Sequence, residues 1–121
     1  MDEFKYFNPE QDPRLFYCSE TGEAGIESDF VHWLDGVREA CGFGFNITSG
    51  YRSAKHSAEA KKEKPGTHNQ GIAADIACTD AARRYEIVKQ AIAHGAGGIG
   101  IAKSFVHVDT RPGDRCVIWT Y

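Results

Sequence analysis

A histidine and an aspartate stand seven residues apart in GTHNQGIAAD, which covers residues 66–75 of the chain. A second pair, His107 and Asp109, lies close to the C-terminal end in SFVHVDT. Two imidazole nitrogens and one carboxylate oxygen, with a fourth position left open, form the ligand set of a catalytic zinc ion. His68, Asp75 and His107 are therefore candidate metal ligands. The alternative is a turn that leads into a strand, in which these side chains are satisfied polar residues.

Strand alternation predicts that these groups share one face of a sheet. In GIAADIAC the isoleucines alternate with Asp75, and in SFVHVDT the valines alternate with His107 and Asp109. If the isoleucines and valines form the core, the three polar side chains lie together on the opposite face. Gly71 permits a sharp turn before the first strand, so that His68 can fold back over Asp75.

The rest of the chain predicts helices early and in the middle, and strands that cluster late. We expect the fold class to be α+β, with a small, largely antiparallel sheet and helices packed on one face. Residues 1–26 are expected to be irregular because prolines and glycines interrupt them. The predicted elements are helices at 28–41, 53–62 and 81–94, a short strand in FNITSGYRS, and strands at 72–77, 99–102, 105–110 and 116–121, the last two joined by a hairpin turn at 111–114.

Composition limits the class of protein. A length of 121 residues corresponds to about one domain, which we expect to span 1–121. Hydrophobic residues make up 41% and charged residues 26%, the balance of a soluble globular protein. The net charge of −3 provides no basic field for nucleic acid. No secretory signal or membrane-spanning stretch is visible, so we expect a soluble, cytoplasmic monomer without membrane partners.

The four cysteines are scattered and form no CxxC pair. We expect reduced, mostly buried thiols, because a cytosolic chain of this size does not need disulfides. A zinc site built from all four thiolates is the alternative.

Four segments in this order, SGYRS, HNQGIAAD, GIGI and FVHVD, resemble the LAS-type zinc metallopeptidases. This family includes D-alanyl-D-alanine carboxypeptidases and L-alanyl-D-glutamate endopeptidases, and it shares its zinc fold with vancomycin-resistance dipeptidases and the Hedgehog signalling domain. The resemblance covers about residues 28–110. His68, Gly71, Ala73 and Asp75 match the family pattern SxHxxGxAxD, and Gly66 stands where the serine is usual.

The resemblance implies a Zn²⁺ cofactor bound by His68, Asp75 and His107. It also implies that Arg52 holds a carboxylate or carbonyl of a peptide substrate, a task that suits the planar guanidinium. Ser53 and Gln70 are further candidates for hydrogen bonds to the substrate.

The general base departs from the family pattern. Many relatives have a Glu or Asp three residues before the last histidine ligand, where this chain has Ser104, which cannot serve as the base. Asp109 is the candidate catalytic residue in its place. The alternative is that Asp109 orients a ligand or pairs with Arg52 or Arg111.

The activity implied by the resemblance is hydrolysis of peptidoglycan stem peptides, by an endopeptidase or a D,D-carboxypeptidase. A small chain without a signal resembles a bacteriophage endolysin, which would accumulate in the cytoplasm of the bacterial host and act on the cell wall after release. Two alternatives stay open: a catalytically inactive wall-binding module that keeps the zinc fold, and a metal-free structural component of a phage particle.

Overall fold

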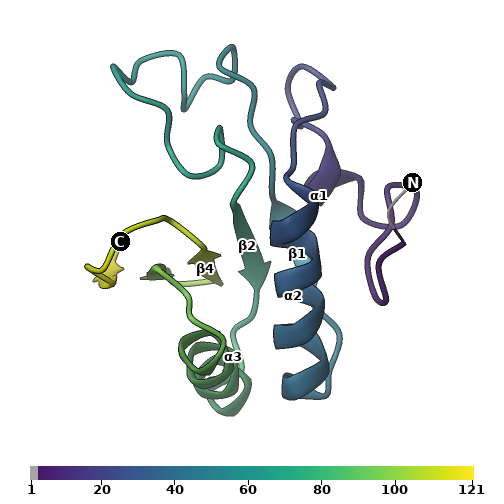
Figure 1. Cartoon of the computed structure of the whole chain (residues 1–121), viewed down its shortest axis with the longest axis vertical. Coiled ribbons are helices and arrows are strands. Elements are labelled where there is room, and N and C mark those ends of the chain that lie inside the picture. The colour runs from purple at the N-terminus through teal and green to yellow at the C-terminus, as the bar shows by residue number, and fades with distance from the viewer. Residues whose placement is uncertain (1–2) are drawn as a thin grey trace.

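Three helices and five strands follow one another in the computed structural model, which describes residues 3–121 (Figure 1). None of the helices in this range is both long and apolar enough to cross a membrane. In chain order the elements are α1 (Pro13–Phe16), α2 (Ser28–Cys41), β1 (Asn46–Ser49), β2 (Ala73–Ala77), α3 (Ala81–Ala93), β3 (Gly98–Ile101), β4 (Phe105–Asp109) and β5 (Val117–Thr120).

The five strands form one mixed sheet in the order β1-β2-β4-β3-β5. The first three pairings in this order are antiparallel, whereas β5 runs parallel to β3. The α+β class is as expected, but the largely antiparallel sheet and the hairpin at 111–114 are not found. The reason is that β4 already pairs with β2 on one edge and β3 on the other. Both edges of β4 are therefore occupied, and β5 joins the sheet at the outer edge of β3.

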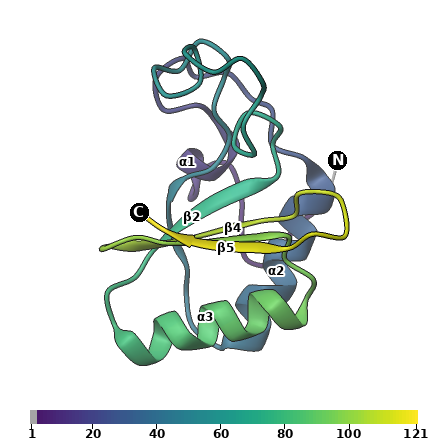
Figure 2. The same ribbon diagram turned by 90° about the vertical axis from the view of Figure 1, so that its left-hand side faces the viewer.

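Helices α2 and α3 cover one face of the sheet, and the long segment between β1 and β2 lies over the other (Figure 2). Apolar side chains from both helices and from alternate strand positions meet between these layers. Helix α2 ends at Cys41, and Gly42 after it adopts a left-handed conformation. The Asp80 side chain caps α3 by accepting a hydrogen bond from the Arg83 N–H. The fully buried core side chains include Leu34, Val37, Ile76, Ile87, Val106 and Val108.

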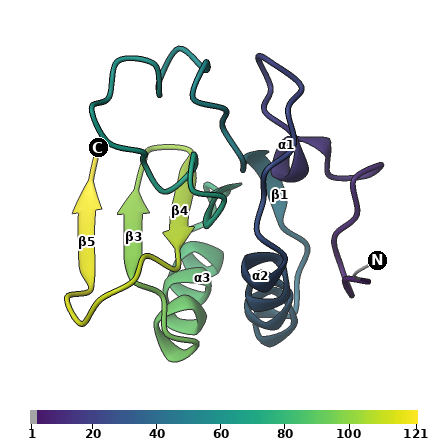
Figure 3. The same cartoon turned by 45° about the horizontal axis from the view of Figure 1, so that its top comes forward.

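The helix expected at 53–62 is wrong, because this segment forms a series of turns. One side chain takes a backbone N–H group that a helix would need: Nδ1 of His56 accepts a hydrogen bond from the Ala58 N–H at 3.0 Å. The long segment therefore has no regular structure of its own and runs over the sheet face opposite α2 and α3 (Figure 3).

Candidate metal centre

Strands β2 and β4 bring the candidate site together. Their antiparallel register sets Asp75 directly opposite His107 and Ala73 opposite Asp109. The apolar neighbours of these residues, such as Ile76 and Val106, point into the core on the other face. The shared polar face expected from strand alternation is confirmed.

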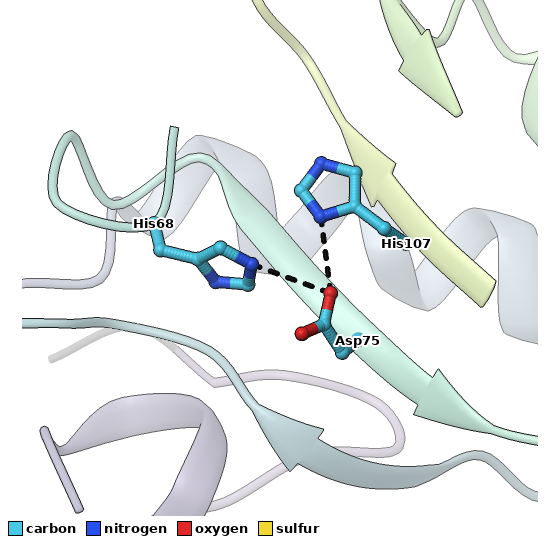
Figure 4. Close-up of side chains that lie close together, drawn as sticks. All are labelled: His68, Asp75 and His107. Atoms are coloured by element: carbon cyan, nitrogen blue, oxygen red, sulfur yellow. Dashed lines mark hydrogen bonds and ion pairs between the residues drawn. The ribbon is translucent and has the colours of Figure 1, made fainter. Parts of the chain in front are cut away.

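His68 reaches the same point from the turn that precedes β2. Gly71 ends this turn with φ 77°, which brings His68 back over the strand. Nε2 of His68 lies 3.3 Å from Oδ1 of Asp75, and Nδ1 of His107 lies 3.0 Å from the same oxygen (Figure 4). All three side chains are buried.

The three side chains offer ligand atoms that lie within 4.8 Å of one another. Each imidazole has one nitrogen held by a protein acceptor, which leaves its other nitrogen facing Asp75. Nδ1 of His68 bonds to the Gly50 carbonyl at 2.7 Å, and Nε2 of His107 bonds to the Asp109 carboxylate at 2.7 Å. Fixed ring orientations of this kind are typical of histidines that bind zinc. The donor set therefore fits the ion.

The charges in this cluster favour an ionised Asp75. Burial opposes ionisation, but the hydrogen bonds with His107 and His68 outweigh it and hold the pKa of Asp75 well below its ordinary value. Burial also works against a charged His107, yet the hydrogen bonds to Asp109 and Asp75 raise the pKa of this imidazole. A carboxylate ready to accept a cation therefore lies between the two imidazoles.

Asp109 lies beneath His107 and is fully buried. Its Oδ2 accepts hydrogen bonds from Nε2 of His107 and Nη2 of Arg111, each at 2.7 Å. Its Oδ1 accepts from the backbone N–H and Nε of Arg111 at 3.1 and 2.9 Å. Against the effect of burial, these bonds keep the pKa of Asp109 well below its ordinary value. Both oxygens are engaged, an arrangement suited to orienting the His107 ring.

A cavity of about 490 Å³ opens beside the three candidate ligands. Arg52 and Gln70 line it, and Nη2 of Arg52 lies 3.6 Å from Oδ2 of Asp75. Ser53 does not reach it: this side chain is buried elsewhere and donates a hydrogen bond to Glu23. The lining residues are Arg52, Lys62, Pro65, Gly66, Thr67, His68, Gln70, Asp75, Phe105, His107, Arg111, Trp119 and Tyr121, and Asp75 has the sole acidic side chain among them.

A family model described as Peptidase M15 matches residues 6–109, which is most of the chain. The chain belongs to the peptidase M15 family. M15 peptidases are zinc-dependent metallopeptidases, and in this member His68, Asp75 and His107 lie together as a possible metal site. No curated protein matches the chain at a significant level.

The cysteines of this M15 peptidase take no part in that cluster. All four are free thiols, and the group of three candidate ligands is the one such cluster within residues 3–121. The four-thiolate zinc site considered from the sequence is therefore not formed.

Sequence reasoning missed how β3 makes room for the site in this M15 peptidase. A Cβ atom at Gly98 would lie 2.5 Å from Oδ2 of Asp109, and one at Gly100 would lie 2.8 Å from the Trp119 ring. The signal was present in GIGI, where glycines alternate with core isoleucines. Glycines on the site face of β3 allow the Asp109–Arg111 pair and the Trp119 ring to approach the backbone.

Proposed function

We propose that this M15 peptidase binds zinc through His68, Asp75 and His107 and hydrolyses peptidoglycan stem peptides. The observation that carries the proposal is the convergence of two oriented imidazoles and an ionised carboxylate at the wall of an open cavity. Family membership supports the peptidase activity, and the resemblance to LAS-type enzymes supports the choice of substrate.

Zinc bound at such a site polarises the scissile carbonyl and activates water for attack at neutral pH. The chain supplies the positioning. Arg52 projects beside Asp75 and offers N–H groups to a carboxylate or carbonyl of the peptide. Arg111 holds Asp109, and Asp109 holds the His107 ring so that Nδ1 faces the other two ligands.

The walls of the cavity suit a peptide that carries negative charge. Arg52, Lys62 and Arg111 line it, against the single carboxylate of Asp75. Trp119 packs beside the His107 ring, with centroids 5.1 Å apart, and provides an apolar surface next to the proposed metal position. Stem peptides bear free carboxylates and small apolar side chains, which match both features. A role in phage lysis rests on the sequence resemblance and stays a prediction.

A second candidate function is a zinc-binding wall module that does not hydrolyse its ligand. Two observations favour it. Position 104 is a serine, and both oxygens of Asp109, the candidate base, are already bonded to Arg111 and His107. Such a module would bind zinc and wall fragments without releasing product.

Digestion of purified peptidoglycan by the zinc-loaded chain tests the proposal. Mass spectrometry of the released peptides identifies the bond cleaved, and Asp75→Asn is expected to lose product release because it weakens the metal site. His94→Ala is the matched control, since this exposed histidine lies outside the cavity. Zinc binding and wall binding without any released peptide would favour the inactive module.

A further inference from the structure

Glu59 is a buried carboxylate in the irregular segment above the sheet. Its side chain is only 2% exposed, although the segment around it consists of turns. Oε1 accepts a hydrogen bond from the Gly66 N–H at 3.2 Å, and Oε2 accepts one from Nζ of Lys62 at 2.8 Å. Nη1 of Arg52 lies 3.9 Å from the same Oε2. One buried oxygen therefore has a cation on each side, and both cations line the cavity.

The ammonium group of Lys62 sits directly over the backbone of Gly66. A Cβ atom at position 66 would lie 2.8 Å from Nζ of Lys62 and 3.0 Å from Oε1 of Glu59. The glycine thus leaves the space into which Glu59 draws the ammonium. The residue at which this chain departs from the usual family serine is the residue that the lysine covers.

Lys62 is the cavity cation with the most capacity left for a ligand. Arg111 has its guanidinium committed to Asp109, and Arg52 is placed between Asp75 and Glu59. An ammonium has three N–H donors, and one of them is used by Glu59. The Lys62 side chain is 45% exposed, against 22% for Arg52 and 33% for Arg111.

We propose that Lys62, held in place by Glu59, is a specificity-determining residue that binds a second free carboxylate of the peptide, next to the group held by Arg52. The inference rests on the proposed function and extends it, because it selects acidic stem peptides over amidated ones. Lys62 binds the substrate, whereas Glu59 is a positioning residue that sets the distance between the two cations.

The test compares two stem peptides that differ in one group: a free carboxylate on the residue after the first L-alanine, or a primary amide in its place. Binding to the zinc-loaded full chain is measured by calorimetry, with KM used in place of Kd where a peptide is cleaved. We expect the wild type to bind the acid about tenfold more tightly than the amide, as a charge-assisted hydrogen bond predicts.

Three variants separate recognition from folding. Lys62→Met keeps the aliphatic stem and is expected to bring the acid-to-amide ratio close to one, while the loss of the Glu59 partner lowers the affinity for both peptides by the same factor. Lys62→Arg keeps the charge and is expected to retain most of the preference. Lys61→Met is the control, because Lys61 is exposed and does not line the cavity.

An acid preference that persists in Lys62→Met, or equal binding of both peptides by the wild type, overturns the inference. If a substitution instead disrupted the segment between β1 and β2, both peptides would bind more weakly. The affinity for the amidated peptide therefore measures this structural effect. Failure of the proposed function is distinguishable, since the wild type would then release no product from either peptide while the Lys62-dependent binding preference remained measurable.

Discussion

Asp109 could act as a general base or as a positioning residue for His107. The two roles differ in how the removal of its side chain would change the affinity for zinc. A general base moves a proton and leaves the metal ligands undisturbed. A positioning residue fixes the His107 ring, and its loss loosens the site. The engagement of both Asp109 oxygens by His107 and Arg111 leads us to propose the second role.

Asp109→Ala is expected to lower zinc affinity about 10- to 100-fold, because the His107 ring loses its hydrogen-bond partner. Competition with a chromophoric chelator measures the affinity directly. Asp114→Ala, which changes an exposed aspartate in the following turn, serves as the control. Unchanged zinc affinity in Asp109→Ala together with lost turnover would instead assign the base to Asp109.

At this scale, the sequence was informative where residue type and alternation coincide. His68, Asp75 and His107 could be selected from two strands and a turn, and the structure brings them together. Lys62 and Glu59 could not be selected, because their pairing depends on the path of a segment without periodicity. Ser53 shows the converse: it follows Arg52 directly, yet its side chain points away from the cavity toward Glu23.

Among the elements, β3 has the tightest requirement for small residues. Gly98 faces the Asp109–Arg111 pair, and no side chain fits between them. We expect Gly98→Ala to lower the free energy of unfolding by about 1–3 kcal/mol and to weaken zinc binding, because the added methyl group must displace that pair. Urea unfolding of the metal-free protein and chelator competition measure the two effects.

Gly44→Ala, in the loop between α2 and β1, is the control, since a Cβ atom there meets nothing within 4 Å. We expect its stability to stay within about 0.5 kcal/mol of the wild type. Equal effects of the two substitutions would contradict the account of β3.

The segment between β1 and β2 depends on Glu59 for its packing. Burial alone would raise the pKa of this carboxyl group, but the Lys62 hydrogen bond, with smaller contributions from the Gly66 N–H and Arg52, lowers it below the ordinary 4.5. Because the pKa is lower in the folded protein than in the unfolded chain, the ionised carboxylate stabilises the fold at pH values above the unfolded pKa. This stabilisation is lost as the pH falls through the folded pKa.

Glu59→Gln is therefore expected to lower the free energy of unfolding by about 1 kcal/mol near neutral pH. The difference from the wild type should shrink as the pH falls below the ordinary pKa of 4.5. Urea unfolding across the acid range measures the difference, with the exposed Glu63→Gln as control. A cost that does not change with pH would mean that the carboxylate charge is not what anchors the segment.

The limits of sequence-based prediction are clear from two elements. Strands β2 and β4 were predictable because the alternation of apolar and polar residues in a strand shows which side chains face the core. The parallel pairing of β5 with β3 was not, because the partner of a strand depends on which sheet edges remain free. Residues 53–62 have a composition compatible with a helix, but the His56 side chain competes for the backbone N–H of Ala58.

On the scale of the whole molecule, the cavity differs in charge from the rest of the chain. The protein has a net charge of −3, whereas the cavity is lined by three cations and one carboxylate, and that carboxylate is a candidate metal ligand. Buried Asp109 and Glu59 pair with Arg111 and Lys62, so a zinc ion at the site would supply the excess positive charge that attracts an anionic peptide. The parallel pairing of β5 with β3 adds Trp119 to the same cavity, beside the His107 ring.

The most direct test of the account is the metal content of the purified chain, measured by elemental mass spectrometry beside His68→Ala and the control His94→Ala. We predict about one zinc ion per chain in the wild type and in His94→Ala, and little in His68→Ala. A wild type that holds no zinc even after incubation with it, or a His68→Ala variant that keeps the full complement, would contradict the proposed centre.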